Sequence, residues 1–297
     1  MPFAHALTRI VTHPGGAHKD ELLACAVCLA NQAVPIERRE PTDADLEDPA
    51  VAVIDIGDRH EPEKSNFDHH QFPREHPPTC SLSLVLQQLG VYADARAFCA
   101  WLEPAEWFDS RGAKATAEHL GIPREAVNQL NSPIDVTLLR RFAAKSRIDP
   151  GEPIHAVLSM IGEDLLDYID GLRAKLAFLA EHATVIDIES EAGVHPVLFL
   201  PRTDPLPPEP SVGIGLYLER AGLSEQVVGL IYPDRRGPGY GLSRHQDHPA
   251  LDFTRVANEP DVHFAHKQGF VAKTTATDPE RLQALVAAAL AATPHED

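Results

Sequence analysis

A continuous apolar run, VAVIDIG (residues 51–57), constrains the fold most, because turn residues flank it on both sides. Such a run is typical of a buried parallel strand that is covered on both faces. Two shorter strand patterns precede it, TRIVTH (residues 8–13) and VPIERRE (residues 34–40), and a helical stretch at residues 20–32 lies between them. This order of strands and helices predicts an α/β fold with a doubly wound, mostly parallel sheet.

The rest of the chain changes character twice. After a helical pattern at residues 81–90, residues 94–182 are mostly helical, and residues 153–182 run without a proline after the first position, which predicts one long linking helix. From Thr184 onward, four strand patterns and a helix near residues 212–221 precede a final helix at residues 278–292. We therefore expect two domains, residues 1–183 and a smaller α+β domain at residues 184–297.

Composition limits the class of protein. The 297 residues are 43% hydrophobic and 24% charged, which is typical of globular proteins. Neither an 18-residue apolar run nor a signal-peptide pattern is found, so we expect no membrane span and no secretion. Cys25 and Cys28 form a C-x-x-C, but their apolar helical flanks favour buried thiols over a redox or zinc pair. A reducing cytoplasm suits these features best.

The net charge of −18 argues against binding to long duplex DNA through a broad basic surface. It does not exclude a nuclease, because metal ions can supply local positive charge at one pocket. The sequence does not specify the oligomeric state, and a homodimer is compatible with it.

Metal-binding residue types follow the predicted strands. The first strand-to-helix loop contains THPGGAHKDE, the buried strand ends near an aspartate, and the next connection contains NFDHHQF. In open α/β sheets, ligands gather outside the carboxyl ends of the strands, so these segments should converge. Mixed His and Asp side chains suit Mn²⁺, Mg²⁺, Fe²⁺ or Zn²⁺. The candidates are His13, His18, Asp20, Asp55, Asp68, His69 and His70.

Each candidate also has a structural interpretation. His13 can be a hydrogen-bonded loop residue, and Asp20 can cap the helix that it begins. Asp55 is harder to explain in this way, because a buried carboxylate without a partner is unfavourable and requires a partner such as a cation. Taken together, about seven candidate ligands favour two ions that share a bridging aspartate over a single ion.

These segments resemble a known superfamily. NFDHHQF, preceded by VIDIGD and by a histidine-rich first loop, is similar to the Asp-His-His motif of the DHH phosphoesterase superfamily. Within it, THPGGAHKDE, FDHHQ and the late FAHKQGFVAK resemble the melanocyte-proliferating-gene family, also described as metal-dependent protein hydrolases (UPF0160). Members of that family are described as 3′-to-5′ RNA exonucleases.

The resemblance implies a role for each ligand. It implies that His13, His18 and Asp55 hold one ion, and that Asp20, Asp55 and His69 hold a second. An aspartate from a later loop should complete the second set, with Asp109 in WFDSRG as the first choice and Asp135 as the alternative. The same resemblance makes Asp68 a support for a histidine and turns His70 toward the scissile phosphate.

Two departures from the superfamily pattern leave questions open. His18 stands where a carboxylate is usual, which leaves the metal preference undetermined, with Mn²⁺ as our first expectation. The Gly-Gly-His segment common in the superfamily is replaced here by FAHKQGFVAK. From this stretch His266 and Lys267 are candidates for phosphate binding, as is Arg244 in GYGLSRH, although all three also suit solvated positions beside turns.

The sequence thus predicts a metal-dependent phosphoric ester hydrolase with two divalent ions. The resemblance to the melanocyte-proliferating-gene family further implies a 3′-to-5′ exonuclease that acts on single-stranded RNA or short oligonucleotides. Two alternatives remain open. One is a hydrolase of small phosphate esters, cyclic dinucleotides or polyphosphate, and the other is a regulatory protein that binds metal without catalysis.

Overall fold

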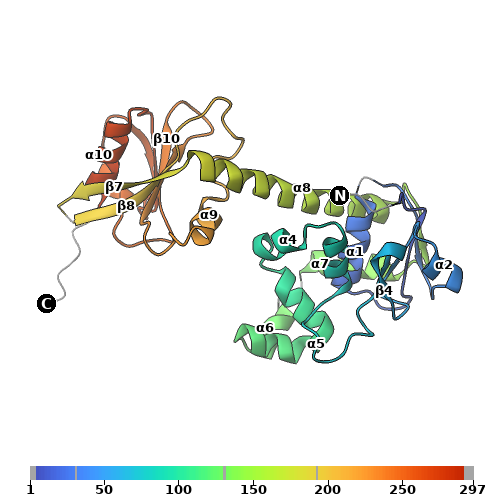
Figure 1. Ribbon diagram of the computed structural model, residues 1–297. Coiled ribbons are helices and arrows are strands. Elements are labelled where there is room, and N and C mark those ends of the chain that lie inside the picture. The colour runs from blue at the N-terminus through green and yellow to red at the C-terminus, as the bar shows by residue number, and fades with distance from the viewer. Residues whose placement is uncertain (1–4, 31, 130–131, 192, 291–297) are drawn as a thin grey trace. The chain divides into compact units, whose positions relative to one another are not determined.

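The computed structural model describes residues 5–30, 32–129, 132–191 and 193–290, which form two compact units (Figure 1). The units are Met1–Gly171 and Leu172–Asp297. The division between the units falls within the long helix α8 (Pro153–His182), whose bounds are those expected from the sequence. The domain boundary expected at residues 183 and 184 stays a prediction. The difference arises because Leu179, near the end of α8, belongs to the core of the second unit.

A six-stranded sheet organises the first unit, in the order β4-β5-β3-β1-β2-β6. Its three inner pairings are parallel, and both edge strands pair antiparallel. The mostly parallel sheet expected from the sequence is therefore confirmed. The two-residue strands β4, β5 and β6 were not expected. The strands are β1 (Arg9–Thr12), β2 (Ile36–Arg38), β3 (Val51–Ile54), β4 (His60–Glu61), β5 (Asn66–Phe67) and β6 (Arg147–Ile148).

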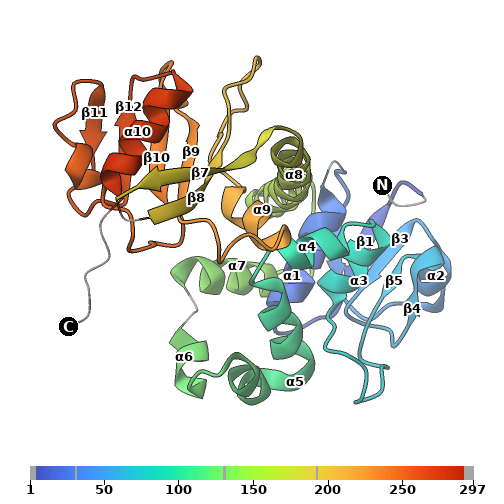
Figure 2. The same ribbon diagram turned by 60° about the vertical axis from the view of Figure 1, so that its left-hand side comes forward.

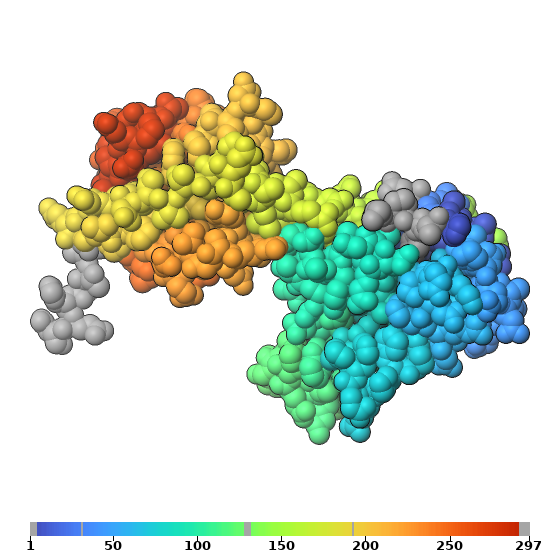
Figure 3. All heavy atoms as spheres, in the orientation of Figure 1, coloured from blue at the N-terminus to red at the C-terminus, as the bar shows by residue number. Residues whose placement is uncertain are grey.

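Helices cover both faces of this sheet, as a doubly wound fold requires (Figure 2). Successive strand residues point to opposite faces, so Val11 and Val53 pack with Leu46 of α2, whereas Ile10 and Ile54 are buried toward the other face. The segments that build this unit lie far apart in sequence but are packed against one another (Figure 3). The helices are α1 (Lys19–Leu29), α2 (Asp43–Glu47), η1 (Pro62–Lys64), α3 (Ser81–Gln88), α4 (Tyr92–Phe98), α5 (Leu102–Leu120), α6 (Arg124–Gln129) and α7 (Pro133–Ala143).

The second unit is a sheet in the order β11-β12-β10-β9-β8-β7, in which only β8 and β9 pair in parallel among the described strands. Val197 faces a core shared with α10, and its neighbour Leu198 faces a second core shared with α9 and α8. The elements are β7 (Thr184–Ser190), β8 (Gly193–Phe199), α9 (Ile214–Arg220), β9 (Gly229–Pro233), β10 (Tyr240–Arg244), η2 (Phe253–Val256), β11 (Val262–Ala265), β12 (Val271–Thr274) and α10 (Pro279–Ala289).

Three smaller expectations have clear outcomes. Asp278 caps α10 by accepting a hydrogen bond from the Arg281 amide, and the expected helix end at Ala292 lies outside the described residues. Cys25 and Cys28 are buried thiols of α1, and burial raises the pKa of both. Among the described helices, none is long and apolar enough to cross a membrane.

Helix α8 packs unusually close to α1. A Cβ built at Gly162 would overlap the carbonyl oxygen of Ala26, whereas a Cβ at Gly171 on the same helix would meet nothing within 4 Å. We predict that Gly162→Ala lowers the free energy of unfolding by about 2–3 kcal/mol, because overpacking moves the two helices apart. Gly171→Ala is the matched control and should raise it by about 0.5–1 kcal/mol through helix propensity. Urea unfolding of both variants measures the difference, and equal effects would contradict the close packing.

Asp45 joins α2 to the sheet. This buried carboxylate accepts hydrogen bonds from Arg39 and Arg9, at 2.7 Å each, and caps its own helix through Thr42. Hydrogen bonds from Arg39 and then from Arg9 hold the pKa of Asp45 well below its ordinary value. A lowered folded-state pKa gives stability that is present above the ordinary carboxyl pKa and is lost as the pH falls below it.

Asp45→Asn should therefore lower the free energy of unfolding at neutral pH by about 2 kcal/mol. The difference from the parent protein should shrink as the pH falls from about 5 toward 2, since the parent carboxylate then takes up a proton. Thermal unfolding as a function of pH measures it. Asp43→Asn, on the exposed side of the same helix, is the control and should change stability by less than about 0.5 kcal/mol. A pH-independent difference would show that charge is not involved.

Candidate metal centre

The first strand-to-helix loop presents His13 and His18. His13 follows β1 directly, and His18 occupies the N-cap of α1. Glu21 fixes the position of this loop. Its side chain is fully buried and accepts hydrogen bonds from the Thr12 hydroxyl (3.0 Å) and the His18 amide (3.2 Å). Its carboxylate also lies 2.9 Å from His13 Nε2. Glu21 thus holds both ends of the loop in place.

Arg38, at the end of β2, completes this support. Its guanidinium donates to the carbonyl oxygens of Gly15 and Gly16, at 3.1 Å each, and to Glu21 at 3.2 Å. It also lies over the ring of Phe142, 4.7 Å from the ring centre. Neither Glu21 nor Arg38 was expected from the sequence to take part in the site. Glu21 had a signal, since an acid three residues after a helix cap is a capping-box position.

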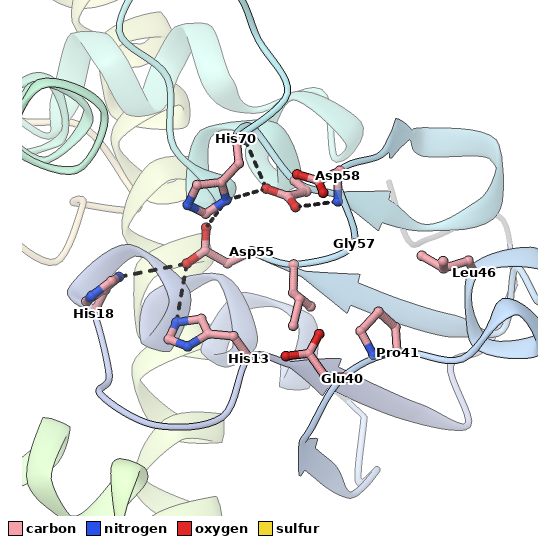
Figure 4. A pocket seen from close by; sticks show the side chains of 11 residues that line it. His13, His18, Glu40, Pro41, Leu46, Asp55, Gly57, Asp58 and His70 are labelled. Atoms are coloured by element: carbon pink, nitrogen blue, oxygen red, sulfur yellow. Dashed lines mark hydrogen bonds and ion pairs between the residues drawn. The ribbon is translucent and has the colours of Figure 1, made fainter.

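Asp55 enters from the next strand. It follows β3 with a positive φ of 59°, and Asp58 has a φ of 53°. Positive φ is unfavourable for residues other than glycine, and such conformations concentrate at functional sites. The turn places the Asp55 carboxylate, 3% exposed, where the Ser81 hydroxyl donates to it at 2.8 Å. The same carboxylate points toward His13 and His18 (Figure 4).

The Asp-His-His segment follows β5, which pairs in parallel with β3, so that the Asp55 amide donates to Phe67 O. Asp68 is buried and accepts from the Asp58 amide (2.8 Å), the His70 amide (3.0 Å) and His70 Nδ1–H (2.7 Å). It therefore orients His70, whose side chain is 55% exposed. The neighbouring side chain of His69 turns inward and is 7% exposed.

Asp109 reaches the same point, with Nε2 of His69 2.8 Å from its Oδ2. It was expected on a loop, and this was wrong: Asp109 lies within α5, before the break at Gly112, where φ is 77°. The alternative, Asp135, accepts a hydrogen bond from the amide of Ser132, the N-cap of α7, at 2.9 Å and pairs with Lys19 at 3.1 Å. Asp135 is not part of the cluster that surrounds Asp55.

Three groups of ligand atoms, each with all members within 4.8 Å of one another, share Asp55. From Asp55, His13 Nε2 lies at 3.5 Å and His18 Nδ1 at 4.0 Å on the Oδ2 side, while His69 Nε2 lies at 3.2 Å from Oδ1. Each oxygen of the Asp55 carboxylate therefore faces different potential metal ligands: Oδ2 faces His13 and His18, and Oδ1 faces His69. The groups are His13, His18 and Asp55; Asp20, Asp55, His69 and Asp109; and Asp55, His69 and His70.

The cluster contains buried polar atoms that need a partner. Within the described part of the chain, four buried atoms of the cluster lack a hydrogen bond of regular geometry: His13 Nε2, Asp20 Oδ2, His69 Nε2 and Asp109 Oδ2. Two of the contacts between them and their neighbours are ion pairs, His13 Nε2 with Glu21 at 2.9 Å and His69 Nε2 with Asp109 at 2.8 Å. Buried polar atoms in folded proteins are nearly always satisfied, and imidazole nitrogens and carboxylate oxygens are donors for divalent cations. The residues present therefore fit a metal centre with Asp55 at its middle.

The electrostatics agree with this fit. Burial, followed by the nearby charges of Asp55 and Asp109, raises the pKa of Asp20 well above its ordinary value. Burial alone would lower the pKa of His69, but the carboxylates of Asp109 and Asp55 raise it to about 10. Glu21 likewise raises the pKa of His13 to about 9. The cluster therefore has an excess of negative charge that protons or cations must balance.

The three substrate-binding candidates lie in the second unit. Arg244 ends β10, and its guanidinium lies beside Asp252 and the turn at Gly269. The His266 ring lies against Phe270, with 4.0 Å between the ring centres, in the same turn between β11 and β12. Lys267 is exposed. The structure thus brings Arg244 and His266 to one turn, and their role in substrate binding stays a prediction.

The structure agrees with the resemblance expected from the sequence. A mostly parallel sheet presents the Asp-His-His segment beside Asp55, which all three groups of ligand atoms share. Residues 9–85 match the family model MYG1_exonuc, described as an uncharacterised protein family (UPF0160), so the resemblance expected from the sequence is confirmed over that segment.

Comparison with curated proteins and with solved structures does not identify a relative of this chain. No curated protein matches the chain. A crystal structure of RecJ from Thermus thermophilus in complex with Mn²⁺ aligns with 95% of this chain and 51% of its own, with 15% identity and a TM-score of 0.30. The chain thus spans about half the length of that RecJ chain, and a TM-score this low does not define a common fold.

Substitution of Asp20 tests whether this residue is a metal ligand or only stabilises the fold. We predict that Asp20→Asn leaves the apo protein as stable or raises its free energy of unfolding by about 1 kcal/mol, because the amide removes repulsion among buried carboxylates. The same variant should lose the rise in melting temperature that Mn²⁺ gives to the parent protein. Glu63→Gln, an exposed change outside the cluster, should retain that rise. A destabilised apo variant that still responds fully to Mn²⁺ would show that Asp20 is structural.

Proposed function

We propose that the protein is a binuclear metal-dependent phosphodiesterase that shortens single-stranded RNA or short oligonucleotides from the 3′ end. The observation that carries this proposal is the position of Asp55 between two sets of ligand atoms, one on each oxygen. A shared carboxylate is typical of two-metal phosphoesterases. The family label MYG1_exonuc supports the exonuclease direction.

The first ion would be held by His13, His18 and Asp55, and the second by Asp20, Asp55, His69 and Asp109. Two divalent ions, Mn²⁺ in our proposal, would supply Lewis acidity and lower the pKa of an attacking water. The ligand count exceeds the four that a closed structural site requires, which favours catalysis over a regulatory role.

His70 would bind the scissile phosphate. Its hydrogen bond to Asp68 raises its pKa, which favours the protonated ring, and over half of its side chain is exposed. A cationic imidazole held in one orientation stabilises charge on a phosphate oxygen without reorganisation. Asp68 is then a positioning residue that acts through His70.

The proposed reaction adds water across the phosphorus–oxygen bond to the 3′ oxygen of the preceding nucleotide. Phosphorus gains the water oxygen, and the 3′ oxygen leaves and takes up a proton. The products are a nucleoside 5′-monophosphate and a chain one nucleotide shorter with a free 3′-hydroxyl group. Glu21 and Arg38 contribute by holding the loop that carries His13 and His18.

We predict Mn²⁺-dependent, stepwise shortening of a 5′-labelled single-stranded oligoribonucleotide. His70→Gln should lower kcat by about 100-fold, because a preorganised charge on the phosphate is lost. It should keep the Mn²⁺-induced rise in melting temperature, since His70 faces substrate. Loss of that rise in His70→Gln would make His70 a metal ligand. Hydrolysis of small phosphoesters or polyphosphate alone, in parallel assays, would overturn the RNA substrate.

A further inference from the structure

A cavity of about 580 Å³ opens beside the metal centre within the first unit. Its volume lies in the range of roughly 300–1,000 Å³ that is usual for small-molecule sites. One wall consists of the metal-centre side chains, including Asp55 and His70. The rest of the lining, here called the far wall, consists of Glu40, Pro41, Leu46, Ile56, Gly57 and Asp58.

No lysine or arginine lines this cavity among the residues that the structure describes. The arginines next to the two acidic lining residues are turned into ion pairs elsewhere. Arg39, beside Glu40, pairs with Asp45 and Glu37 at 2.7 Å each. Arg59, beside Asp58, pairs with Glu47 at 2.9 Å. The far wall therefore has no positive charge of its own.

The carboxylates of Glu40 and Asp58 are available as hydrogen-bond acceptors. Both residues are exposed, and in the part of the chain described here neither side chain has a hydrogen bond or an ion pair. Pro41, Leu46 and Ile56 add apolar side chains to the same lining. The far wall thus combines unpaired acceptors with a surface suited to an uncharged, flat group.

We propose that this cavity takes the uncharged sugar and base of a terminal ribonucleoside, whose 5′-phosphate lies at the metal centre. The proposal rests on the proposed function and specifies its substrate end. The 2′- and 3′-hydroxyl groups donate to the carboxylates of Glu40 and Asp58, and the base lies on the apolar surface. Carboxylates accept hydrogen bonds from hydroxyl groups and repel phosphate.

The carboxylates of the far wall also disfavour ligands that carry an additional phosphate group. A 3′-phosphate on the terminal nucleoside would place two negative charges beside two carboxylates, with no cation to compensate. The next phosphate of a polyphosphate chain would meet the same repulsion. The cavity therefore selects an end with a free 3′-hydroxyl group, which is the end that a 3′-to-5′ exonuclease must engage.

Calorimetric titration of the Mn²⁺-loaded full chain tests this by binding rather than turnover. 5′-AMP should bind at least about tenfold more tightly than adenosine 3′,5′-bisphosphate, since like charges in a partly enclosed site repel. 2′,3′-Dideoxy-AMP, which lacks both hydroxyl donors, should bind about tenfold more weakly than 5′-AMP. Equal affinity for 5′-AMP and the bisphosphate would overturn the proposal.

Substitution of Glu40 assigns the effect to this wall. In Glu40→Gln, the preference for 5′-AMP over the bisphosphate should fall to about threefold, because one of the two repelling charges is gone. Glu40→Lys should abolish or reverse the preference. Glu63→Gln, an exposed acid outside the cavity, should keep the parent ratio. An unchanged ratio in Glu40→Gln and Glu40→Lys would overturn the assignment.

The binding and cleavage assays separate the two proposals. Selective binding of 5′-AMP without cleavage of RNA would overturn the exonuclease proposal and leave the nucleoside cavity in place. Shortening of RNA by a protein that binds 5′-AMP and the bisphosphate equally would support the exonuclease proposal and overturn the nucleoside cavity. No binding of 5′-AMP in the presence of Mn²⁺ would overturn the inference whatever the cleavage assay shows.

Discussion

Repulsion among buried carboxylates is the constraint around which the first unit is built. Asp55 is almost completely buried at the end of an apolar strand, and Asp20 and Asp109 contribute ligand atoms to the same group within 4.8 Å. Burying like charges together is strongly unfavourable without a compensating cation. The parallel pairing of β3 with β1 and β5 nevertheless brings Asp55 to the sheet edge where His13 and His69 follow their strands, and α1 and α5 add Asp20 and Asp109 there. The stability of this edge therefore depends on the protons or cations that balance its negative charge.

Neutral and charged hydrogen bonds around the cluster fix the orientation of its side chains. Ser81 orients Asp55, Asp68 orients His70, and Glu21 with Arg38 fixes the first loop. Each of these contacts comes from a different strand or helix, so the cluster depends on the whole sheet. Such support keeps ligands in place before a cation arrives, and this preorganisation is what metal sites and charge-stabilising sites require.

Prediction from sequence succeeded where periodicity or a local motif carried the information. The continuous apolar run at Val51–Ile54 became the central strand β3, and Asp278 caps α10 as expected. It failed for β4, β5 and β6, because two-residue strands are too short to show a period. Asp109 was expected on a loop because the family resemblance implied an aspartate from a later loop, whereas it lies within α5.

The sequence by itself determined the residue types of the metal centre and the order in which they follow the strands, because both are local properties of the chain. Only the tertiary structure decided that Asp109 rather than Asp135 joins Asp55, and that Arg38 supports a loop more than twenty positions earlier. It also decided that Arg39 and Arg59 turn away from the cavity and leave Glu40 and Asp58 unpaired. Side-chain direction depends on partners distant in sequence, and a linear pattern does not contain them.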